Sequence, residues 1–409
     1  MKKILLLGGS AQQVIAIEKA KELGMYTIVC DYLIDNPGQY VADKFYLAST
    51  TDKELILKIA KEEKIDGIVA YASDPAAPTA AYVAEKMNLP GNPYKSVEIL
   101  CNKDKFRKFL GENGFNTPKS KGYSNIEDAS NDIKNDEFEF PIIIKPVDSS
   151  GSKGISVLHD KSKLKKSIEY ALSFSRCKKI IVEKFIEKKH EYLVGGDLFI
   201  KDGKIVLWGL LNCHRDSNVN KLVPVGKSYP LRIDEFDEKN VKNTLQKLVD
   251  ELHIKSGAMN VELIIDKNDK VWLVDVGPRN GGNMIPDLLG YIFNVDVVEM
   301  TIKAAMEMEF AINNDNIVDK CFYATHNLHS SENGFFEGVE FSDEIEKYIF
   351  RKNIYKKQND IVEYFDHAAK AIGIIFMKFN SKDEMNKVLD NINSHINIRL
   401  RTKGSESNE

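Results

Sequence analysis

The chain has 409 residues, of which 43% are hydrophobic and 29% are charged, and its formal net charge is −4. This length is too great for one hydrophobic core and predicts two or three domains of an ordinary globular protein. The charge argues against nucleic acid or an anionic membrane as a partner, and five scattered cysteines without a CxxC pair argue against a zinc site or a disulfide framework.

Residues 1–95 alternate predicted strands and helices in the order typical of a parallel α/β sheet. Apolar runs predict strands at 3–7, 26–31 and 66–71, and helices are expected at 11–24, 53–64 and 77–88. We therefore expect an α/β domain whose sheet is covered on both faces. The apolar run at the start is too short for a signal peptide, and no stretch reaches the ~20 apolar residues of a membrane span. A cytoplasmic protein is expected.

Small and acidic residues follow the predicted strands of this domain. Gly8, Gly9 and Ser10 open a helix whose backbone N–H groups could hold an anion, but they do not form the GxGxxG dinucleotide fingerprint. Asp31 and Asp74 follow later strands. Ligands of open α/β sheets bind at the carboxyl ends of strands, so Gly9, Asp31 and Asp74 could face the substrate. A tight strand–helix turn is the alternative for the glycines.

A second region, residues 96–307, begins with a helical stretch at 96–113 and then changes to an α+β pattern. Strands are predicted at 140–146, 153–159, 179–186, 192–200 and 204–211, and helices at 161–174, 240–253 and 283–293. Short strands joined by turns favour mainly antiparallel pairing. We expect one half at 96–190 and a second half at 191–307.

Lys145 ends an apolar strand, and the loop that follows it is rich in glycine and serine. Ser150, Gly151 and Gly154 belong to this strand–loop–strand flap. Such a flap can cover phosphates with backbone N–H donors while a lysine neutralises their charge. A plain flexible hairpin is the alternative, although a lysine at the base of an apolar strand needs a partner.

The segment at 179–194 runs from a strand through an extended linker into another strand. Such a linker offers N–H and C=O groups to the edge of an adenine, and Glu191 can accept hydrogen bonds from ribose hydroxyls. By itself this pattern is not specific.

Residues 213–230 are expected to form a loop that could close over a substrate. The GKS sequence at 226–228 resembles half of a phosphate-binding P-loop, but the first glycine and the following helix are missing. Lys227 is therefore interpreted as a loop cation. With His214, Arg215 and Lys221 it could meet an anionic substrate, and a solvated mobile loop is the alternative.

Two carboxylates occur in a predicted hairpin at 260–276. If the turn is centred on Asn268 and Asp269, Glu262 falls opposite Asp275. Like charges opposite each other are destabilising, so a cation is expected between them. Mg²⁺ suits such oxygen ligands, because it is usually bound by one or two carboxylates and the phosphates of a nucleotide. Arg279 follows in a glycine-rich segment, which favours a phosphate site over the alternative of a solvated acidic hairpin.

A third segment begins at about residue 308. It contains a predicted strand at 371–379 and a predicted helix at 382–395. We expect residues 308–400 to form a small α+β domain and the polar residues 401–409 to form a disordered tail.

In their order along the chain, these segments resemble the ATP-grasp superfamily, in the branch near carbamoyl-phosphate synthase large subunits, biotin carboxylases and purine-pathway carboxylases. The motifs that carry the resemblance are GGSAQQ, YASDPAAPTAAY, NKDKFRKFL, the Lys145 strand with its glycine flap, VEKFIEKKHEY and VELIID…LVDVGPRNGG. They cover roughly residues 1–305. The resemblance implies an ATP-grasp fold with antiparallel sheets, preceded by a parallel α/β domain and followed by a small α+β segment.

The resemblance also implies roles for single residues. Lys103 and Lys145 would contact the phosphates of ATP, Glu183, Lys184 and Ile186 would form the adenine hinge, and Glu191 would bind the ribose. Glu262 and Asp275 would hold one or two Mg²⁺ ions, with Mn²⁺ as an alternative metal. Arg279 would contact an acyl-phosphate or tetrahedral intermediate.

Two departures from the family pattern leave alternatives open. The usual E-x-N-P-R motif reads Asp275-Val276-Gly277-Pro278-Arg279 here, so the asparagine that often completes the shell of a second metal is missing. Asn280 or Asn283 could substitute for it, or the second metal would be bound more weakly. One additional residue before Glu191 leaves Glu187 or His190 as alternatives for the ribose contact.

Such a site can activate a carboxylate by positioning and electrostatics. We therefore predict an ATP- and Mg²⁺-dependent carboxylate–amine ligase that forms an acyl-phosphate and then an amide or peptide-like bond, with Arg279 and Lys227 as catalytic residues. A small carboxylic acid and an amine are the expected substrates, and a homodimer is the default assembly. The alternatives are a bicarbonate-activating carboxylase or carbamoyl-phosphate synthase-like enzyme, and a nucleotide-binding regulatory protein without catalysis.

Overall fold

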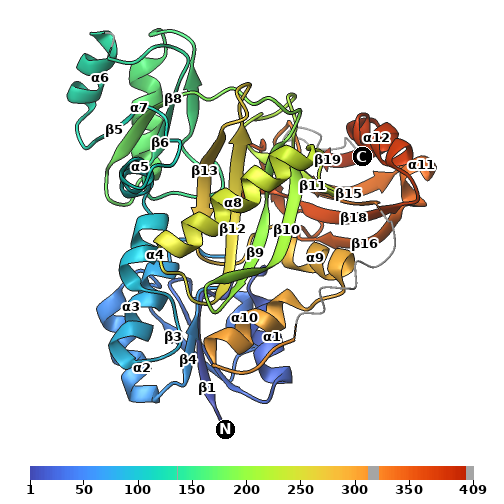
Figure 1. The fold of residues 1–409 in the computed structure, drawn as a ribbon. Helices are drawn as coiled ribbons and strands as arrows, with labels where there is room; N and C mark the ends of the chain where they lie inside the picture. The colour runs from blue at the N-terminus through green and yellow to red at the C-terminus, as the bar shows by residue number, and fades with distance from the viewer. Residues whose placement is uncertain (136, 312–321, 402–409) are drawn as a thin grey trace.

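The computed structural model describes residues 1–135, 137–311 and 322–401. Its N-terminal part contains a four-stranded parallel sheet in the order β3-β2-β1-β4, drawn in blue in Figure 1. The elements are β1 (Lys3–Leu7), α1 (Val14–Glu22), β2 (Tyr26–Asp31), η1 (Pro37–Tyr40), β3 (Lys44–Leu47), α2 (Lys53–Glu63), β4 (Gly67–Val69) and α3 (Ala77–Met87). This confirms the predicted parallel sheet. The edge strand β3 was not predicted, because its four residues are only partly buried.

Both faces of this sheet are covered, as alternation along the strands requires. Leu5 and Leu7 pack in one cluster with residues of α2 and α3. Ile4 and Leu6 pack in another with α1 and with α10 (Val297–Ala305), which comes from much later in the chain.

Two helices lead out of this part, where one continuous helical stretch was predicted. They are α4 (Tyr94–Leu100) and α5 (Lys103–Glu112). The break falls at Asn102, whose side chain accepts a hydrogen bond from the Lys105 N–H at 3.1 Å and so caps α5.

A four-stranded antiparallel sheet, in the order β5-β8-β6-β7, carries the predicted flap. Its elements are β5 (Ser120–Tyr123), α6 (Ile126–Lys134), β6 (Ile142–Pro146), β7 (Ser156–Leu158), α7 (Leu164–Phe174) and β8 (Ile180–Lys184). The two helices share a buried cluster with the strands.

An eight-stranded antiparallel sheet forms the centre of the molecule, in the order β13-β12-β9-β10-β11-β14-β18-β16 (Figure 1). Its strands are β9 (Leu193–Lys201), β10 (Lys204–Arg215), β11 (Pro224–Tyr229), β12 (Gly257–Ile265), β13 (Val271–Gly277), β14 (Phe322–Leu328), β16 (Ile349–Ile354) and β18 (Gly373–Phe379). Helix α8 (Glu235–Glu251) packs in one buried cluster with this sheet and α9 (Ile285–Phe293) in another. The predicted antiparallel pairing is confirmed.

The prediction of a loop at 213–230 is wrong for half of its length. Cys213 and His214 lie in β10, and Lys227 lies in β11, directly opposite Cys213. The connection between Arg215 and Pro224 leaves the sheet. Strands β10 and β14 pair with β11 on its two sides and hold it as a strand.

The C-terminal segment contributes to the central sheet and adds a three-stranded sheet in the order β17-β15-β19. Its other elements are β15 (Gly334–Phe341), α11 (Asp343–Glu346), β17 (Ile361–Val362), η2 (Ala368–Lys370), α12 (Lys382–Leu389), η3 (Ile392–His395) and β19 (Ile396–Arg401). The predicted boundary near 308 thus separates strands of one sheet, and the division into domains stays a prediction. The predicted tail, apart from Arg401, lies outside the described residues. No helix in the described ranges is long and apolar enough to cross a membrane.

Candidate active site

The two hairpin carboxylates lie opposite each other, as the sequence predicted. Glu262 of β12 pairs with Asp275 of β13. Closer to the tip, however, Leu263 pairs with Leu273, so that the pairing there is symmetric about Asn268. One extra residue on β13, Val274, makes a bulge that restores the register of the carboxylates.

Each carboxylate has a cation beside it. Glu262 forms an ion pair with Arg215 at the end of β10, and Asp275 lies 3.3 Å from Lys103 Nζ at the start of α5. Desolvation in the cleft raises the pKa of Asp275, but the charges of Lys103 and Lys145 outweigh it and hold that pKa below its ordinary value. No group of three or more metal-ligating side chains was found over the described part of the chain. The hairpin therefore offers a two-carboxylate site.

A buried ion network lies next to this hairpin. Lys145 Nζ is 2.7 Å from Glu183, and Arg107 Nε is 2.8 Å from the same carboxylate. All three side chains are almost fully buried. Burial raises the pKa of Glu183, but Arg107 and Lys145 outweigh it and hold that pKa at about 2. Burial lowers the pKa of Lys145, and Glu183 opposes this shift.

Arg107 is a member of the site that the sequence analysis missed. It also donates hydrogen bonds to the carbonyl oxygens of Leu273 and Val274, at 2.9 and 2.7 Å. These are the carbonyls at the bulge, so Arg107 ties Glu183 to the hairpin. Its signal was its position four residues after Lys103, which places both cations on one face of α5.

The flap residues are held from two sides. Lys103 Nζ donates to the carbonyl of Ser149 at 3.1 Å, next to Ser150, and the Ala368 N–H donates to the carbonyl of Gly151 at 3.2 Å. Gly154 has a φ of +73°, and a Cβ there would lie 2.8 Å from Pro146 Cγ. Gly154 is therefore required for the close return of the flap onto β6.

The linker after β8 includes amides that make no hydrogen bond among the described residues, and Ile186 carries the first of them. The N–H groups of Lys184 and Phe185 donate to Lys119 and Pro141 carbonyls at 2.9 and 3.0 Å. Among the described residues no hydrogen bond is made by the N–H of Ile186. That amide remains available to the edge of an adenine.

The candidates for the ribose contact differ in their partners. Glu191 is exposed, and its carboxylate makes a long contact of 4.0 Å with Arg232. His190 Nε2 lies much closer, at 2.7 Å, to the buried carboxylate of Asp237. Glu187 lies 3.3 Å from Lys267 on the surface. Lys184 also points outwards, because its side chain pairs with Glu139 at 2.9 Å. Of the three ribose candidates, His190 is the most firmly held by a protein partner.

Arg279 joins the hairpin to the N-terminal sheet. Its Nε donates to Asp74 at 2.8 Å, and the Asn260 N–H donates to its carbonyl at 3.0 Å. A Cβ on Gly277 would lie 2.4 Å from Asp74 Oδ1. An asparagine at position 277 would therefore require the Asp74 and Arg279 side chains to shift, and Gly277 leaves room for their contact.

The proposed substitutes for that asparagine are differently placed. Asn280 is buried, and its side-chain oxygen accepts a hydrogen bond from Thr301 at 3.1 Å, so it is turned towards α10. Asn283 precedes α9, and its N–H donates to Gln12 at 3.2 Å. The side-chain oxygen of Asn280 is therefore not directed at the hairpin carboxylates.

Lys227 is a buried cation, where a loop cation was predicted. Its Nζ lies 2.6 Å from Cys213 Sγ, and Gly195 gives both groups room, since a Cβ there would lie 3.2 Å from Nζ. The buried carboxylate of Asp197, held by the Gly281 N–H at 2.7 Å, was also missed. Burial raises its pKa, and the charges of Arg279 and Lys227 oppose this. The sequence feature that could have identified Asp197 is a carboxylate within an apolar predicted strand.

In the N-terminal sheet, the Gly9 N–H donates to Asp31 at 2.8 Å. The carboxylate of the protein itself therefore occupies the position that an anion would take at this helix start. Asp74 is thus the member of the predicted set that reaches the hairpin, through Arg279.

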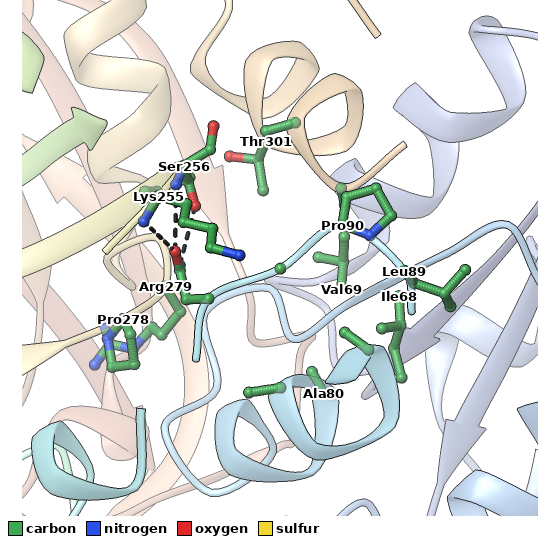
Figure 2. Close-up of a pocket in the computed structure, with 18 of the residues that line it drawn as sticks. Ile68, Val69, Ala80, Leu89, Pro90, Lys255, Ser256, Pro278, Arg279 and Thr301 are labelled. Atoms are coloured by element: carbon green, nitrogen blue, oxygen red, sulfur yellow. Dashed lines mark hydrogen bonds between the residues drawn. The ribbon is translucent and has the colours of Figure 1, made fainter. Parts of the chain in front are cut away.

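A cavity of about 620 Å³ lies beside the loop that carries Arg279. Figure 2 shows Val69, Leu89 and Pro90 across from Lys255 and Ser256. Its lining does not include Lys103, Lys145, Glu262 or Asp275. The cavity lies between the N-terminal sheet and the rest of the molecule, and it touches the base of the hairpin at Gly257 and Ala258 but not its carboxylates.

Comparison with known proteins adds an independent line of evidence. A family model described as "Carbamoyl-phosphate synthase L chain, ATP binding domain" matches residues 102–312. The large chain of carbamoyl phosphate synthase from Thermotoga petrophila is 26% identical over 241 residues, which are 58% of this chain and 21% of that protein. The formate-dependent phosphoribosylglycinamide formyltransferase of Prochlorococcus marinus is 34% identical over 193 residues, 46% of this chain and 48% of that protein. The chain thus spans about a fifth to a half of the lengths of these relatives.

A solved structure is similar over almost the whole chain. The L-amino acid ligase from Bacillus licheniformis superimposes with a TM-score of 0.81 and 18% identity, over 98% of this chain and 99% of that one. At this identity the likeness concerns the fold.

Proposed function

The chain belongs to the family of the carbamoyl-phosphate synthase L chain ATP-binding domain, within the ATP-grasp superfamily, and from this membership we propose that it is an ADP-forming carboxylate–amine ligase. In this reaction a carboxylate oxygen attacks the γ-phosphate of ATP and ADP leaves. An amine then attacks the acyl-phosphate, phosphate leaves, and the amine loses a proton as the amide forms. A small carboxylic acid and a small amine are the proposed substrates.

The observation that carries this proposal is the grouping of cations around one pair of carboxylates. Lys103 and Lys145 come from separate elements, and both influence Asp275. Lys145 is kept in place by Glu183, which Arg107 connects to the hairpin. Fixed positive groups beside a glycine flap suit the charge that develops on a transferred phosphoryl group.

The hairpin residues fit a magnesium ion. Glu262 and Asp275 provide an all-oxygen donor set on adjacent strands, and both now lie beside cations that a metal would replace. When bound with ATP, Mg²⁺ supplies neutralisation of phosphate charge. The position of Asn280 supports one firmly held ion rather than two.

The other residues have proposed roles in binding and orientation. Lys103 and Lys145 hold the phosphates under Ser150, Gly151 and Gly154, which exclude water from the acyl-phosphate. The adenine lies against Glu183, Lys184 and Ile186, with Glu191 at the ribose. Arg279, oriented by Asp74, and Lys227 face the acid as it is activated.

The test is a phosphate-release assay on the purified chain with ATP, Mg²⁺ and a panel of acids and amines. The ligase predicts release that requires both an acid and an amine, with an amide detected by mass spectrometry. Release that depends on bicarbonate instead identifies the carboxylase or carbamoyl-phosphate synthase-like alternative, for which the matched family model is the supporting observation. Tight ATP binding without release under any condition would leave a regulatory binding protein.

Glu262→Gln provides the accompanying prediction, because it removes a charge from the proposed metal site and keeps the shape of the side chain. We expect no measurable ADP formation and weaker binding of Mg²⁺ in the presence of ADP, measured by calorimetry, in a chain that still folds and melts cooperatively. Glu251→Gln, on the exposed end of α8, is the matched control. Full activity of Glu262→Gln would refute the metal assignment.

A further inference from the structure

Two cavities, of about 370 and 390 Å³, meet beside the ends of β10 and β14. Both are lined by Asp216, Asn218, His326 and Asn393. His214 lines the first and His329 the second, and η3 and its neighbours form the C-terminal wall. We call the joint space, defined by these six residues, the histidine cavity.

The imidazole of His326 makes no hydrogen bond among the described residues, although the residue is only 5% exposed. Its ring centroid lies 5.3 Å from that of His329, and it lines both parts of the cavity. The other two imidazoles are occupied. His214 Nε2 lies 2.8 Å from Ser228 Oγ, and His329 Nε2 lies 3.0 Å from Asp216. Burial lowers the pKa of His326, so it is neutral and offers one N–H donor to a ligand.

The acidic group in the wall is already compensated. Asp216 accepts hydrogen bonds from the Asn218 N–H at 2.8 Å and from Asn393 at 2.7 Å, besides its contact with His329. The other acidic residues of the lining, Asp390 and Glu332, are exposed to solvent. The wall of the cavity thus presents no buried uncompensated anion.

Arg215 connects the cavity with the candidate active site. It lines the cavity, while its guanidinium forms the ion pair with Glu262. Its other contact is from Nη1 to the His214 carbonyl at 3.3 Å. A metal ion held by Glu262 would take away the carboxylate that, among the described residues, is paired with Arg215. A partly buried guanidinium without a counter-charge is unfavourable, so it needs a new anion.

We propose that the histidine cavity binds an anionic group, a carboxylate or a phosphate, through Arg215 and His326 when a divalent cation occupies Glu262. The proposal rests on the metal role of Glu262 in the proposed function. It implies that anion and metal bind cooperatively, each strengthening the other by the same factor.

The test is calorimetric titration of malonate into the full chain loaded with Mg²⁺ and a non-hydrolysable ATP analogue, which fills the phosphate positions. We expect one malonate per chain, and affinity lower by about tenfold when Mg²⁺ is omitted. Arg215→Gln and His326→Phe should each lower the affinity for malonate by about tenfold or more. Arg215→Gln should also remove the effect of Mg²⁺ on malonate.

The controls separate a specific site from a general loss of charge or fold. Arg399→Gln and His159→Phe change exposed residues of the same types and should leave malonate affinity unchanged. His326→Gln keeps an N–H donor and should retain most of the affinity, even if the phenylalanine variant is unstable. Binding of malonate that is equal in wild type, Arg215→Gln and His326→Gln, with or without Mg²⁺, would overturn the proposal, as would no binding at all.

Kinetics then distinguish the two sources of the anion. If it belongs to a substrate, dicarboxylic acids in the phosphate-release assay should have lower KM than matched monocarboxylic acids, and malonate should compete with them. If it is a free ion, malonate should instead stimulate turnover of monocarboxylic acids. Because calorimetry does not need turnover, malonate binding without any phosphate release would refute the ligase and keep the anion site.

Discussion

Arg107 shows how much of the candidate site depends on single hydrogen bonds. One guanidinium contacts the carboxylate that holds Lys145 and also both carbonyls at the bulge next to Asp275. Five N–H donors in a fixed plane allow this, and a lysine could not replace them. Arg107 is therefore a positioning residue between Lys145, the proposed phosphate ligand, and the hairpin proposed to hold the metal.

Glu183→Gln tests the buried network. In the folded chain the pKa of Glu183 is about 2 instead of 4.5, so its charge should stabilise the fold by about 3 kcal/mol, at roughly 1.4 kcal/mol per pKa unit. This contribution is complete above about pH 4.5 and is lost as the pH falls through about 2. We expect the variant to be less stable by about this amount at pH 7, and the difference to narrow at pH 3, in urea unfolding.

The matched control for this change is Glu139→Gln, which breaks an exposed pair with Lys184. Surface pairs contribute little, so its unfolding midpoint should stay close to wild type. Equal effects of the two variants, or a difference that grows on acidification, would contradict the proposed network.

Lys227→Ala tests the proposed contact with the acid. Removal of one buried charge should raise the KM of the acid by about tenfold and leave the KM of ATP within about twofold. Steady-state phosphate release with each substrate varied in turn measures both constants. Lys221→Ala changes an exposed cation in the neighbouring connection and should have no effect. An unchanged KM for the acid in Lys227→Ala would show that Lys227 has a structural role beside Cys213 instead.

At the scale of elements, the sequence predicted the pairing of the carboxylates but not how the chain achieves it. The hairpin is symmetric about Asn268 at its tip, which alone would set Val274 opposite Glu262. A bulge shifts the register by one residue, so that Asp275 lies opposite Glu262. Nothing in the apolar pattern of β13 distinguishes Val274 as the extra residue. Local patterns show which strands pair, whereas a bulge is fixed by tertiary contacts such as those of Arg107.

The same limit explains the wrong prediction at 213–230. A loop was expected there, but β10 and β14 pair with residues 224–229 from both sides. One of these partners is about a hundred residues away and cannot be inferred from local pattern. By contrast Lys145 was predicted correctly as a lysine needing a partner, although the sequence did not connect it with Glu183 or Arg107.

Two flap glycines give a matched test of backbone geometry. Both Gly151 and Gly154 have φ near +70°, but only at Gly154 would a Cβ contact other atoms too closely, at 2.8 Å. Gly151→Ala should cost about 1 kcal/mol of stability, from left-handed strain alone. Gly154→Ala should cost about 1–3 kcal/mol more and should weaken ATP binding. Thermal unfolding and nucleotide titration of both variants measure the difference, and equal costs would show that the close contact is relieved by movement of the flap.

At the scale of the whole molecule, the N-terminal sheet, the flap sheet and the C-terminal strands meet at the candidate site. Arg279 links the hairpin to Asp74, which follows β4 of the N-terminal sheet. Ala368 of the C-terminal segment donates a hydrogen bond to the flap. The central sheet continues from β11 into β14 without a break. The candidate site is therefore not contained in any one of the three predicted domains.

A chain that ends at residue 311 tests this continuity. It would leave the edge of β11 unpaired and remove Tyr323, Ile374 and Phe376 from a buried cluster. We expect it to aggregate or to lack a cooperative thermal transition, and co-expression of residues 312–409 to restore a soluble complex. A truncated chain that melts cooperatively near the wild-type temperature would show that residues 1–311 form an independent unit.

The pairing of β11 with β14 also sets an order of events during synthesis. Lys227 and Thr325, which face each other across these strands, are 98 residues apart, a distance that a ribosome covers in about 5–20 s. In the second half of that interval the nascent chain holds Lys103, Lys145 and both hairpin carboxylates, but β11, which carries Lys227, is paired with β10 on one edge and still lacks β14 on the other. The proposed site for the acid is thus completed after the proposed nucleotide-binding residues have been synthesised, and a chaperone that shields this edge would act on a chain that already carries them.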